Sequence, residues 1–560
     1  MDVERIWLKS YPEGVPADID MGEYSSLKDI IESSCVKFRD LPAYSNMGMV
    51  LDYAKLDALS RAFGAWLQNE AGLQKGDRVA IMMPNVLQYP VAVFGALRAG
   101  MVVVNVNPMY TPRELKHQLT DSGAKAIVIV ENFASTLEKV RDAVPVEKII
   151  TTQIGDLLGF PKSKLINFAI KTVKKMVPPW SLPGAVSFSQ VIKAGAASSL
   201  NEVTLTHDDI AFLQYTGGTT GVAKGAMLTH GNMVANVLQS AAWLGKKTRE
   251  GEDRIITALP LYHIFSLTAN CLTFMKMGGE NVLITNPRDF DGFIKTLKKA
   301  TFTGFTGVNT LFNALINHPE FPSVDFSRLK LTLGGGMAVQ RGVAEQWRKI
   351  TGHALIEAYG LTETSPAACI NPMDNEEFNG AIGLPISSTA VTIRDDDGNL
   401  LPLGEIGEIC ISGPQVMKGY WNRPEATAEV MTPDGALRTG DMGRMDEQGY
   451  VFLTDRKKDM ILVSGFNVYP NELEEVICLH PGVLEAAAIG VPDEKSGEAI
   501  KVFVVLKDKS LDAAAIKAHC REHLTGYKVP RQVEFRDELP KSNVGKILRR
   551  ELRDAETAKA

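Results

Sequence analysis

The sequence predicts an α/β protein with a large N-terminal domain of two αβ-layered sheets, a small β-barrel subdomain, and a smaller, mobile α+β C-terminal domain. Three observations predict this class. The chain has 560 residues, which is too long for one hydrophobic core. Wholly apolar, strand-length runs alternate with helical patterns through most of the chain. From about residue 390 the pattern changes to short β-strands, and a compact unit of its own follows residue 458.

Residues 51–130 carry the first αβ rhythm. Residues 56–67, 91–97 and 112–119 have helical character, and the second of these helices ends before Gly100, where glycine is favoured. Apolar runs at 79–83, 102–106 and 126–130 are too short for helices and read as buried strands. Such strands separated by helices indicate a parallel sheet covered on both faces.

Residues 157–180 interrupt this rhythm with a basic amphipathic segment. Apolar residues between 165 and 177 can share one helical face, and five lysines between 162 and 175 occur with no acidic residue among them. In a protein with a net charge of -6, such a segment followed by Trp180 is a candidate membrane-surface contact. An ordinary surface helix docked on the sheet explains the pattern equally well.

The αβ rhythm resumes from 255 to 336. Strands are predicted at 255–259, 282–284, 302–307 and 329–333, and the last opens into Gly334, Gly335 and Gly336. Residues 391–394 and 407–412 flank an Asp-Gly turn and predict antiparallel strands. In the last hundred residues, helices at 472–478 and 512–524 and strands at 486–491 and 502–506 predict a separate domain.

The stretch from Tyr215 to Gly225 is the most informative in the chain. It holds four glycines, three threonines, a tyrosine and Lys224, directly after a predicted strand at 210–214 and before a segment leading to a helix. Glycines let successive N–H groups converge on an anion, and hydroxyls and a lysine add to that site. The sequence therefore predicts a polyphosphate loop, although not of the G-x-x-x-x-G-K-[ST] type, because Ala223 and Gly225 flank the lysine. A flexible surface linker is the alternative.

Further motifs are weak one by one. In residues 357–363 a tyrosine next to a glycine can stack on a base, and Glu363 can hold a hard cation. Asp441 follows a Thr-Gly turn and could accept ribose hydroxyls. The charged run 455–459 and Lys546 on a Gly-containing turn are, taken alone, typical of solvated surface.

Composition limits the other possibilities. The net charge of -6 argues against nucleic-acid binding by the whole chain. Six cysteines lie far apart without a C-x-x-C pair, which fits reduced thiols in a cytoplasm and neither a zinc site nor disulfides. The N-terminus lacks a signal-peptide pattern, and no apolar run approaches the ~20 residues of a spanning helix. We expect a cytoplasmic protein, at most peripheral on the cytoplasmic face of the inner membrane.

Taken together and in this order, these stretches resemble the adenylate-forming acyl-CoA synthetase superfamily over residues 52–553. Within it the nearest likeness is to the bacterial long-chain fatty-acid–CoA ligases, carried by residues 434–443 and 455–458. Ala436 and Arg438 depart from that pattern, where an aromatic residue and a histidine are common. We expect these two changes to affect chain-length preference more than reaction type.

The resemblance implies a role for each matching residue. The β- and γ-phosphates would be cradled by Thr216, Gly217, Gly218, Thr219, Thr220, Gly221 and Lys224. The adenine slot would be formed by Gly334, Gly335, Gly336, Tyr359 and Gly360, with Asp441 and Arg456 on the ribose. Thr362 would contact the α-phosphate, Glu363 would hold Mg²⁺, and Lys546 would reach the α-phosphate and the attacking carboxylate.

Other roles concern the acyl chain, coenzyme A and domain motion. His263, with Val308, Asn309 and Thr310, would line the acyl tunnel, although a structural histidine is nearly as plausible at 263. Ser464, Gly465 and Phe466 would meet coenzyme A, and Lys458 matches the hinge. The implied division is a catalytic domain at 1–454, a hinge at 455–459 and a mobile domain at 460–560.

The implied reaction is activation of a fatty acid by ATP, with Mg²⁺, to an acyl-adenylate and pyrophosphate, followed by acyl transfer to coenzyme A. The family suggests a homodimer. Two alternatives stay open: an adenylate-forming ligase for another acid or acceptor, and a non-catalytic nucleotide-binding relative. The second would be expected to lack Glu363, Asp441 or Lys546, and all three are present.

Overall fold

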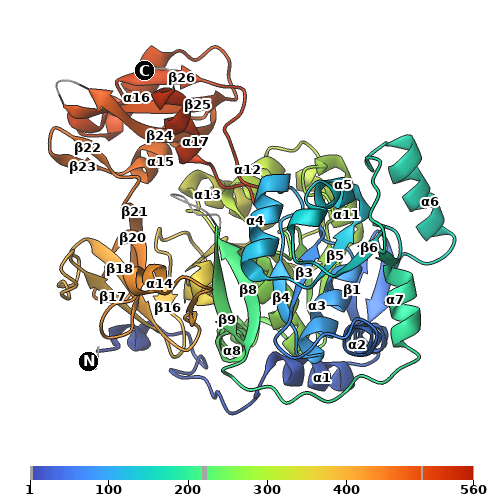
Figure 1. Cartoon of the computed structure of the whole chain (residues 1–560). Helices are drawn as coiled ribbons and strands as arrows, with labels where there is room; N and C mark the ends of the chain where they lie inside the picture. The colour runs from blue at the N-terminus through green and yellow to red at the C-terminus, as the bar shows by residue number, and fades with distance from the viewer. Residues whose placement is uncertain (1–3, 217–222, 494–495, 559–560) are drawn as a thin grey trace.

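The computed structural model describes residues 4–216, 223–493 and 496–558 (Figure 1). Its larger part contains two sheets with helices packed against them, followed by a small antiparallel sheet. A separate α+β unit forms the C-terminal end of the chain. The predicted α/β class, with two layered sheets in the larger part and a separate α+β C-terminal domain, is therefore confirmed.

The first sheet has eight strands in the order β19-β9-β8-β4-β3-β5-β6-β7. Its central strands pair in parallel and are buried along their length, as the apolar runs predict. The strands are β3 (Arg78–Met82), β4 (Val102–Asn105), β5 (Ala126–Val130), β6 (Lys148–Thr152), β7 (Val186–Ser187), β8 (Ile210–Thr216), β9 (Lys224–Thr229) and β19 (Gly419–Tyr420).

The second sheet has nine strands in the order β16-β15-β14-β13-β12-β10-β11-β1-β2. Its strands are β1 (Pro42–Asn46), β2 (Met49–Asp52), β10 (Arg254–Thr257), β11 (Glu280–Leu283), β12 (Gly304–Gly307), β13 (Leu331–Gly334), β14 (Ile356–Gly360), β15 (Ala367–Ile370) and β16 (Leu384–Pro385).

Helices cover these two sheets and fill the space between them. They are α1 (Leu27–Lys37), α2 (Tyr53–Asn69), α3 (Gln88–Arg98), α4 (Pro112–Ser122), α5 (Ala134–Glu138), α6 (Lys162–Phe168), α7 (Phe188–Gly195), α8 (His230–Leu244), α9 (Ile264–Ser266), α10 (Thr273–Met277), α11 (Phe290–Lys299), α12 (Asn309–Ile316), α13 (Arg341–Thr351) and α14 (Pro424–Val430). No helix in the described part of the chain is both long enough and apolar enough to cross a membrane.

Local signals explain where individual helices begin and end. Helix α4 has Thr111 and Glu114 in a capping box, with a proline in its first turn. Gly123 ends it in the left-handed conformation, with φ of 62°. Each of these signals depends on residues within one turn of a helix end, so the sequence alone can predict where α4 begins and ends.

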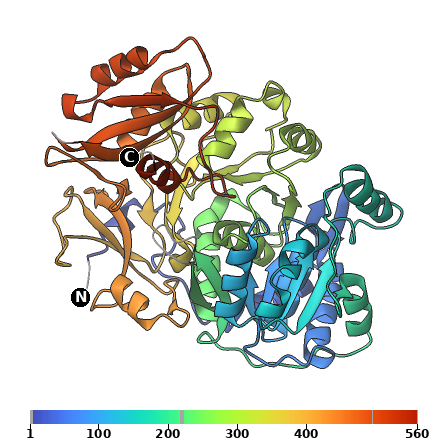
Figure 2. The same ribbon diagram turned by 45° about the horizontal axis from the view of Figure 1, so that its top comes forward.

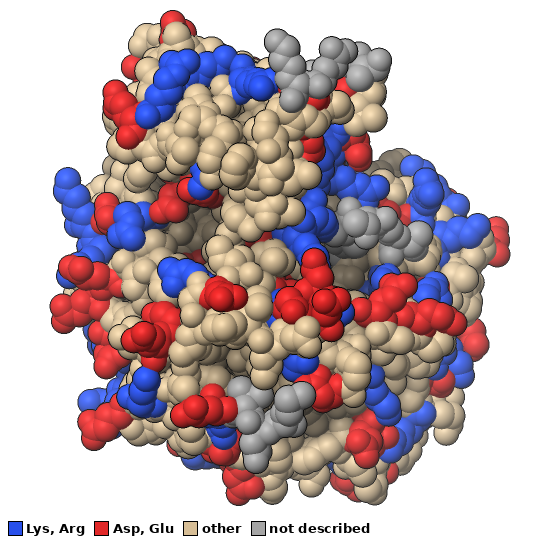
Figure 3. All heavy atoms as spheres, turned by 90° about the vertical axis from the view of Figure 1, so that its left-hand side faces the viewer, with Lys and Arg blue, Asp and Glu red and all other residues tan. Residues whose placement is uncertain are grey.

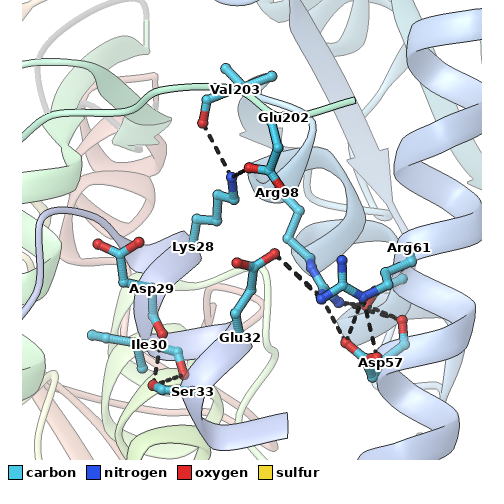
Figure 4. Close-up of polar contacts among 11 residues, drawn as sticks. Lys28, Asp29, Ile30, Glu32, Ser33, Asp57, Arg61, Arg98, Glu202 and Val203 are labelled. Atoms are coloured by element: carbon cyan, nitrogen blue, oxygen red, sulfur yellow. Dashed lines mark hydrogen bonds and ion pairs between the residues drawn. The ribbon is translucent and has the colours of Figure 1, made fainter. Parts of the chain in front are cut away.

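A buried arginine paired with two partly exposed carboxylates links the first three helices (Figure 4). The Arg98 guanidinium of α3 is fully buried and donates to Asp57 of α2 at 2.7 Å and to Ser60 Oγ at 2.8 Å. Glu32 of α1 lies 3.5 Å from the same guanidinium. Because a buried charge is costly unless it is paired, these contacts fix how α1, α2 and α3 pack.

The small sheet has the order β17-β18-β20-β21 and is antiparallel. Its strands are β17 (Ala390–Arg394), β18 (Gly407–Ser412), β20 (Leu437–Met445) and β21 (Val451–Arg456). The sequence predicted a barrel here. Within the described residues β21 does not pair back with β17, so this subdomain is an open sheet.

The C-terminal domain packs helices on a sheet of five strands. It contains β22 (Ile461–Val463), β23 (Phe466–Val468), α15 (Pro470–Leu479), β24 (Val483–Asp493), β25 (Gly497–Leu506), α16 (Ala513–His523), β26 (Gln532–Phe535) and α17 (Arg549–Thr557). It lies over the small sheet and over α12 and α13, as Figure 2 also shows.

Hydrogen bonds join the C-terminal domain to the α12 region. Thr310 Oγ1 donates to the Gly545 carbonyl at 2.9 Å, and Asn313 Nδ2 donates to the Leu484 carbonyl at 3.0 Å. Nearby, Gln340 Nε2, just before α13, donates to Cys478 Sγ at 3.3 Å. The domain is thus seated on α12 in the orientation described here.

Candidate active site

A cleft of about 2130 Å³ lies between the C-terminal domain and the rest of the molecule. Figure 3 shows this hollowed face, with basic side chains gathered beside the hollow and acidic ones along its lower edge. Most of the residues singled out from the sequence line it: Thr216, Lys224, His263, Asn309, Thr310, Gly336, Tyr359, Gly360, Thr362, Glu363, Asp441, Arg456, Lys458 and Lys546. The topology thus brings together residues more than 300 positions apart.

The predicted phosphate loop connects two strands of one hairpin. Strands β8 and β9 pair antiparallel, with Thr216 opposite Lys224. The sequence suggested that the chain leads from the loop towards a helix; the structure inserts β9 first, and α8 begins at His230. Gly217, Gly218, Thr219, Thr220 and Gly221 lie outside the described residues. The hairpin places both flanking residues at the rim of the cleft.

Glu363 is held by a tyrosine that the sequence analysis did not identify. Tyr420 donates a hydrogen bond from its hydroxyl to Glu363 Oε1 at 2.7 Å. The ring of Tyr420 also lies 5.0 Å from Lys224 Nζ. Tyr420 belongs to β19, which pairs with β9, so one side chain connects the loop lysine with the predicted metal ligand. Burial and the adjacent carboxylate both raise the pKa of Tyr420, so its hydroxyl stays a donor.

Gly360 and its neighbour Tyr359 approach other groups closely. A Cβ on Gly360 would lie 1.9 Å from the Pro366 carbonyl oxygen, so only glycine fits there. Tyr359 donates to Asp441 Oδ2 at 2.7 Å. Arg456 Nε lies 3.5 Å from Asp441 Oδ1, because β20 and β21 place these two residues opposite each other. Burial raises the pKa of Asp441, and Arg456 opposes that shift.

Lys546 reaches into the cleft from the loop before α17. Its side chain passes close to Gly336, whose φ of 78° favours glycine, and a Cβ there would lie in van der Waals contact with Lys546 Cε, at 3.5 Å. Burial lowers the pKa of Lys546 to about 8, and Arg456 adds to the shift. Asp441 and Glu363 act in the opposite direction. Lys546, Asp441 and Glu363 all line the same cleft.

An apolar pocket opens beside Lys546, with a volume of about 90 Å³. It shares with the cleft a set of residues at its mouth: His263, Gly336, Ala358, Tyr359, Gly360, Leu361, Thr362 and Lys546. Its wall is formed largely by apolar side chains, including Trp243, Leu244, Ile255, Phe274, Leu331 and Met373. Gly335 also lines it, whereas Gly334 lines neither cavity and packs against Leu355.

His263 stands where the cleft meets this pocket. Burial lowers the pKa of His263 to about 3, and Lys546 adds to the shift. The neutral ring accepts a hydrogen bond at Nδ1 from the Phe265 N–H at 3.3 Å. The proton is therefore on Nε2.

The other residues predicted for the acyl tunnel have different surroundings. Val308, Asn309 and Thr310 are not among those lining the apolar pocket. Asn309 accepts from the Gln340 N–H at 3.0 Å, and Thr310 contacts the C-terminal domain. Their assignment to an acyl tunnel stays a prediction.

Ala436 and Arg438, the two departures from the pattern, also lie away from the apolar pocket. Arg438 lines the cleft and pairs with Glu408 at 3.3 Å. Neither residue contacts the apolar pocket, so the structure does not support the expected effect of these two positions on chain-length preference.

The turn Ser464-Gly465-Phe466 lies at the tip of the β22–β23 hairpin, outside the lining of the cleft. Gly465 has φ of 84°, and the Phe466 ring stacks on Tyr527 at 4.8 Å. Lys458 lies between β21 and β22, and burial lowers its pKa to about 8.

An ion-pair network surrounds the predicted hinge. Arg549 of α17 lies 2.6 Å from Glu474, 3.2 Å from Asp455 and 3.5 Å from Asp459. The Asn471 N–H donates to Asp455 Oδ2 at 2.7 Å. Asp455 belongs to β21 of the small sheet, so the network crosses from that sheet to the C-terminal domain.

Comparison with known proteins agrees with this arrangement. The family of AMP-binding enzymes matches residues 31–421, and the family described as AMP-binding enzyme C-terminal domain matches residues 472–546. The chain belongs to the AMP-binding enzymes. A long-chain-fatty-acid–CoA ligase of Yersinia pestis is 59% identical over 554 residues, covering 99% of this chain and 98% of that protein.

Solved structures place this AMP-binding enzyme among proteins of the same fold. ATP-bound MatB from Rhodopseudomonas palustris matches with a TM-score of 0.78 and 30% identity, over 94% of this chain and 98% of that chain. The anthranilate CoA ligase AuaEII, solved with anthranoyl-AMP, matches with a TM-score of 0.86 and 24% identity, over 97% and 99%. The second likeness concerns the fold alone.

Proposed function

We propose that this protein is a long-chain fatty-acid–CoA ligase that forms AMP. The observation that carries the proposal is the meeting of a polar cleft and an apolar pocket at Lys546. A substrate with a reactive carboxylate and an apolar tail would place the carboxylate at this junction and the first carbons of the tail in the pocket. The ligase from Yersinia pestis, similar over nearly its whole length, supports this substrate class.

In the first step, a carboxylate oxygen of the fatty acid attacks the α-phosphorus of ATP, and the bond to pyrophosphate breaks. Lys546 and Thr362 bind where negative charge gathers in the transition state. The phosphates that leave are held by Lys224, Thr216 and the glycine-rich loop. Because His263 is neutral, it adds no second cation beside the carboxylate.

The nucleoside is bound by the cleft wall. Tyr359, Gly360 and the Gly334–Gly336 turn form the adenine slot, and Asp441 and Arg456 bind the ribose hydroxyls. Ribose binding would take place at carboxylate oxygens already oriented by Tyr359 and Arg456. The site is therefore pre-organised before ATP arrives.

Glu363 fits a magnesium ligand. Mg²⁺ prefers oxygen donors and often takes a single carboxylate plus substrate phosphates. The Tyr420 hydroxyl fixes the orientation of the Glu363 carboxylate at the edge of the cleft. The ion would neutralise charge on the ATP phosphates.

In the second step, the thiol of coenzyme A attacks the acyl carbonyl and AMP leaves. Lys546 occupies the mouth of the pocket, so the C-terminal domain (460–560) rotates about Lys458 in the hinge 455–459, relative to 1–454. That rotation brings Ser464, Gly465 and Phe466 to the pocket in its place. Domain rotation of this kind serves both half-reactions with one site.

The decisive experiment is ATP–pyrophosphate exchange without coenzyme A, for a series of fatty acids, on wild type and Lys546→Ala. We expect exchange with long acids and a loss on the order of 10²–10³-fold in the variant. Exchange with only short or aromatic acids would replace the fatty acid by another substrate. ATP binding with no exchange for any acid would favour the non-catalytic alternative.

We further infer a cytoplasmic homodimer that contacts the membrane surface through residues 157–180. Helix α6 buries no side chain and lies at the edge of the molecule, far from the C-terminal domain (Figure 1). Five large apolar side chains of this segment are exposed, at 51–87%: Phe160, Leu165, Phe168, Val173 and Met176. Lysines surround them, which suits an anionic bilayer.

Co-flotation with vesicles containing anionic lipid tests the contact. The double variant Leu165→Glu/Phe168→Glu should lose flotation and keep pyrophosphate exchange with a long acid supplied in solution without vesicles. Flotation equal to that of wild type would contradict the membrane contact and leave the ligase assignment intact. Light scattering of the same samples measures the oligomeric state.

A further inference from the structure

We propose that His519, Glu522 and His523, at the C-terminal end of helix α16, bind a divalent transition-metal ion of the imidazole-preferring class, such as Zn²⁺. This site goes beyond the ligase function. None of the three residues lines the cleft or the apolar pocket. It is also distinct from the magnesium site at Glu363, because that site offers oxygen donors to a hard cation.

The spacing of the three residues places them together. They occupy positions i, i+3 and i+4 of α16, and such residues share one face of a helix. One ligand atom from each lies within 4.8 Å of the others. Among the described residues, no other group of three or more His, Cys, Asp or Glu side chains meets that criterion. Rotation of exposed side chains closes the remaining distance to the ~2 Å that zinc requires.

Histidines concentrate unusually at this point. The chain has nine, and three of them lie together here: the ring centroid of His519 is 4.7 Å from that of His523 and 5.2 Å from that of His480. His480 frames the site and does not ligate in this geometry, because its Nδ1 accepts from the Gly482 N–H at 3.2 Å. Two imidazoles and a carboxylate leave a fourth tetrahedral position for water.

One ligand is already oriented as in known metal sites. His519 Nε2 lies 2.8 Å from the Val476 carbonyl oxygen in α15, and a carbonyl can only accept. Nε2 therefore carries the proton, and Nδ1 presents its lone pair to a metal. A carbonyl that accepts from the other ring nitrogen fixes the tautomer and orientation of a metal-binding histidine. A cation at this end of the helix is also favoured by the helix dipole.

The cysteines do not form a competing cluster. Five of the six are buried and the sixth, Cys478, is partly buried. Among the described residues, none of them belongs to a group of three side chains close enough to share an ion.

The test is isothermal titration of the tag-free, full-length protein with ZnCl₂, in excess Mg²⁺ so that the oxygen sites are occupied. Wild type should bind one Zn²⁺ per chain and gain thermal stability, because the ion binds the folded state. His519→Gln/His523→Gln should weaken binding by at least about tenfold and lose the stabilisation. The matched control His318→Gln removes a histidine paired with Asp291 elsewhere and should bind like wild type.

Absence of saturable binding by wild type would overturn the proposal. Equal binding by wild type and the double variant would do so as well, since the ion would then lie elsewhere. Pyrophosphate exchange is measured on the same samples. We expect both variants to keep it, so the outcome for the metal site is independent of that for the proposed ligase function.

Discussion

At the scale of single residues, the cleft works through side chains whose ionisation is shifted by burial. Lys546 and His263 both lose affinity for protons there, but with opposite consequences at neutral pH. The pKa of Lys546 falls only to about 8, so it still carries charge, whereas that of His263 falls to about 3 and the ring is neutral. One cation therefore faces the reacting carboxylate.

The pH dependence of adenylation follows from Lys546. In the proposed mechanism its protonated form stabilises the transition state, so kcat/KM for ATP in the exchange reaction should decline as the pH rises through about 8. Lys546→Arg should remove this decline, because a guanidinium stays protonated. A wild-type profile that stays flat up to pH 9.5, about 1.5 units beyond that pKa, would contradict the assignment.

Tyr420 is predicted to position Glu363 without contacting substrate. Tyr420→Phe removes the hydrogen bond of 2.7 Å to Oε1. We expect the Mg²⁺ concentration needed for half-maximal exchange to rise about tenfold, as for other residues that orient metal ligands. Tyr450→Phe removes a hydroxyl outside the cleft and should leave the magnesium titration unchanged. An effect on kcat alone, with no change in magnesium dependence, would argue against this role.

At the scale of secondary-structure elements, the packing of α1, α2 and α3 depends on the buried Arg98. Asp57→Ala would leave this guanidinium without its 2.7 Å partner, and breaking such a pair costs about 3 kcal/mol. Arg61→Ala removes an exposed partner of the same aspartate and should cost less than about 1 kcal/mol. Urea denaturation of both variants measures the difference; equal losses would show that burial of Arg98 does not matter.

Elements with local signals were predictable from the sequence, and contacts between distant segments were not. The capping box and the ending glycine mark α4 within one stretch of chain, and the apolar run of β5 marks a buried strand. Strand β9 carries no such mark, because residues 224–229 pair with β8 only through the hairpin. Tyr420 was missed because it is 57 residues from Glu363, and no spacing rule connects them.

The active-site residues show the same limit. Asp441 and Arg456 face each other across β20 and β21. The resemblance implied that both bind the ribose, but their spacing in the sequence does not predict that they are paired. The resemblance placed Thr310 in an acyl tunnel. In the structure its hydroxyl contacts Gly545, because α12 supports the C-terminal domain.

At the scale of the whole molecule, α12 determines where the C-terminal domain places Lys546. Thr310→Val removes the hydrogen bond to Gly545, next to the lysine, and one such bond is worth about 1 kcal/mol. We expect pyrophosphate exchange to slow about fivefold, while acyl transfer from supplied acyl-adenylate to coenzyme A stays unchanged. Thr296→Val, on the surface of α11, is the control. Equal slowing of both half-reactions would contradict a role confined to this domain orientation.

The Arg549 network gives this orientation a resistance to rotation. Arg549 is three residues from Lys546 and lies 3.2 Å from Asp455, at the start of the predicted hinge and in β21 of the small sheet. The proposed rotation of the domain would separate that pair while both groups are still largely buried, which would oppose the first part of the movement. The free enzyme would then spend most of its time in the orientation that places Lys546 in the cleft, ready for ATP. Burial raises the pKa of Asp455 to about 6. Mild acid would therefore protonate Asp455, weaken its ion pair with Arg549 and make the domain rotation easier.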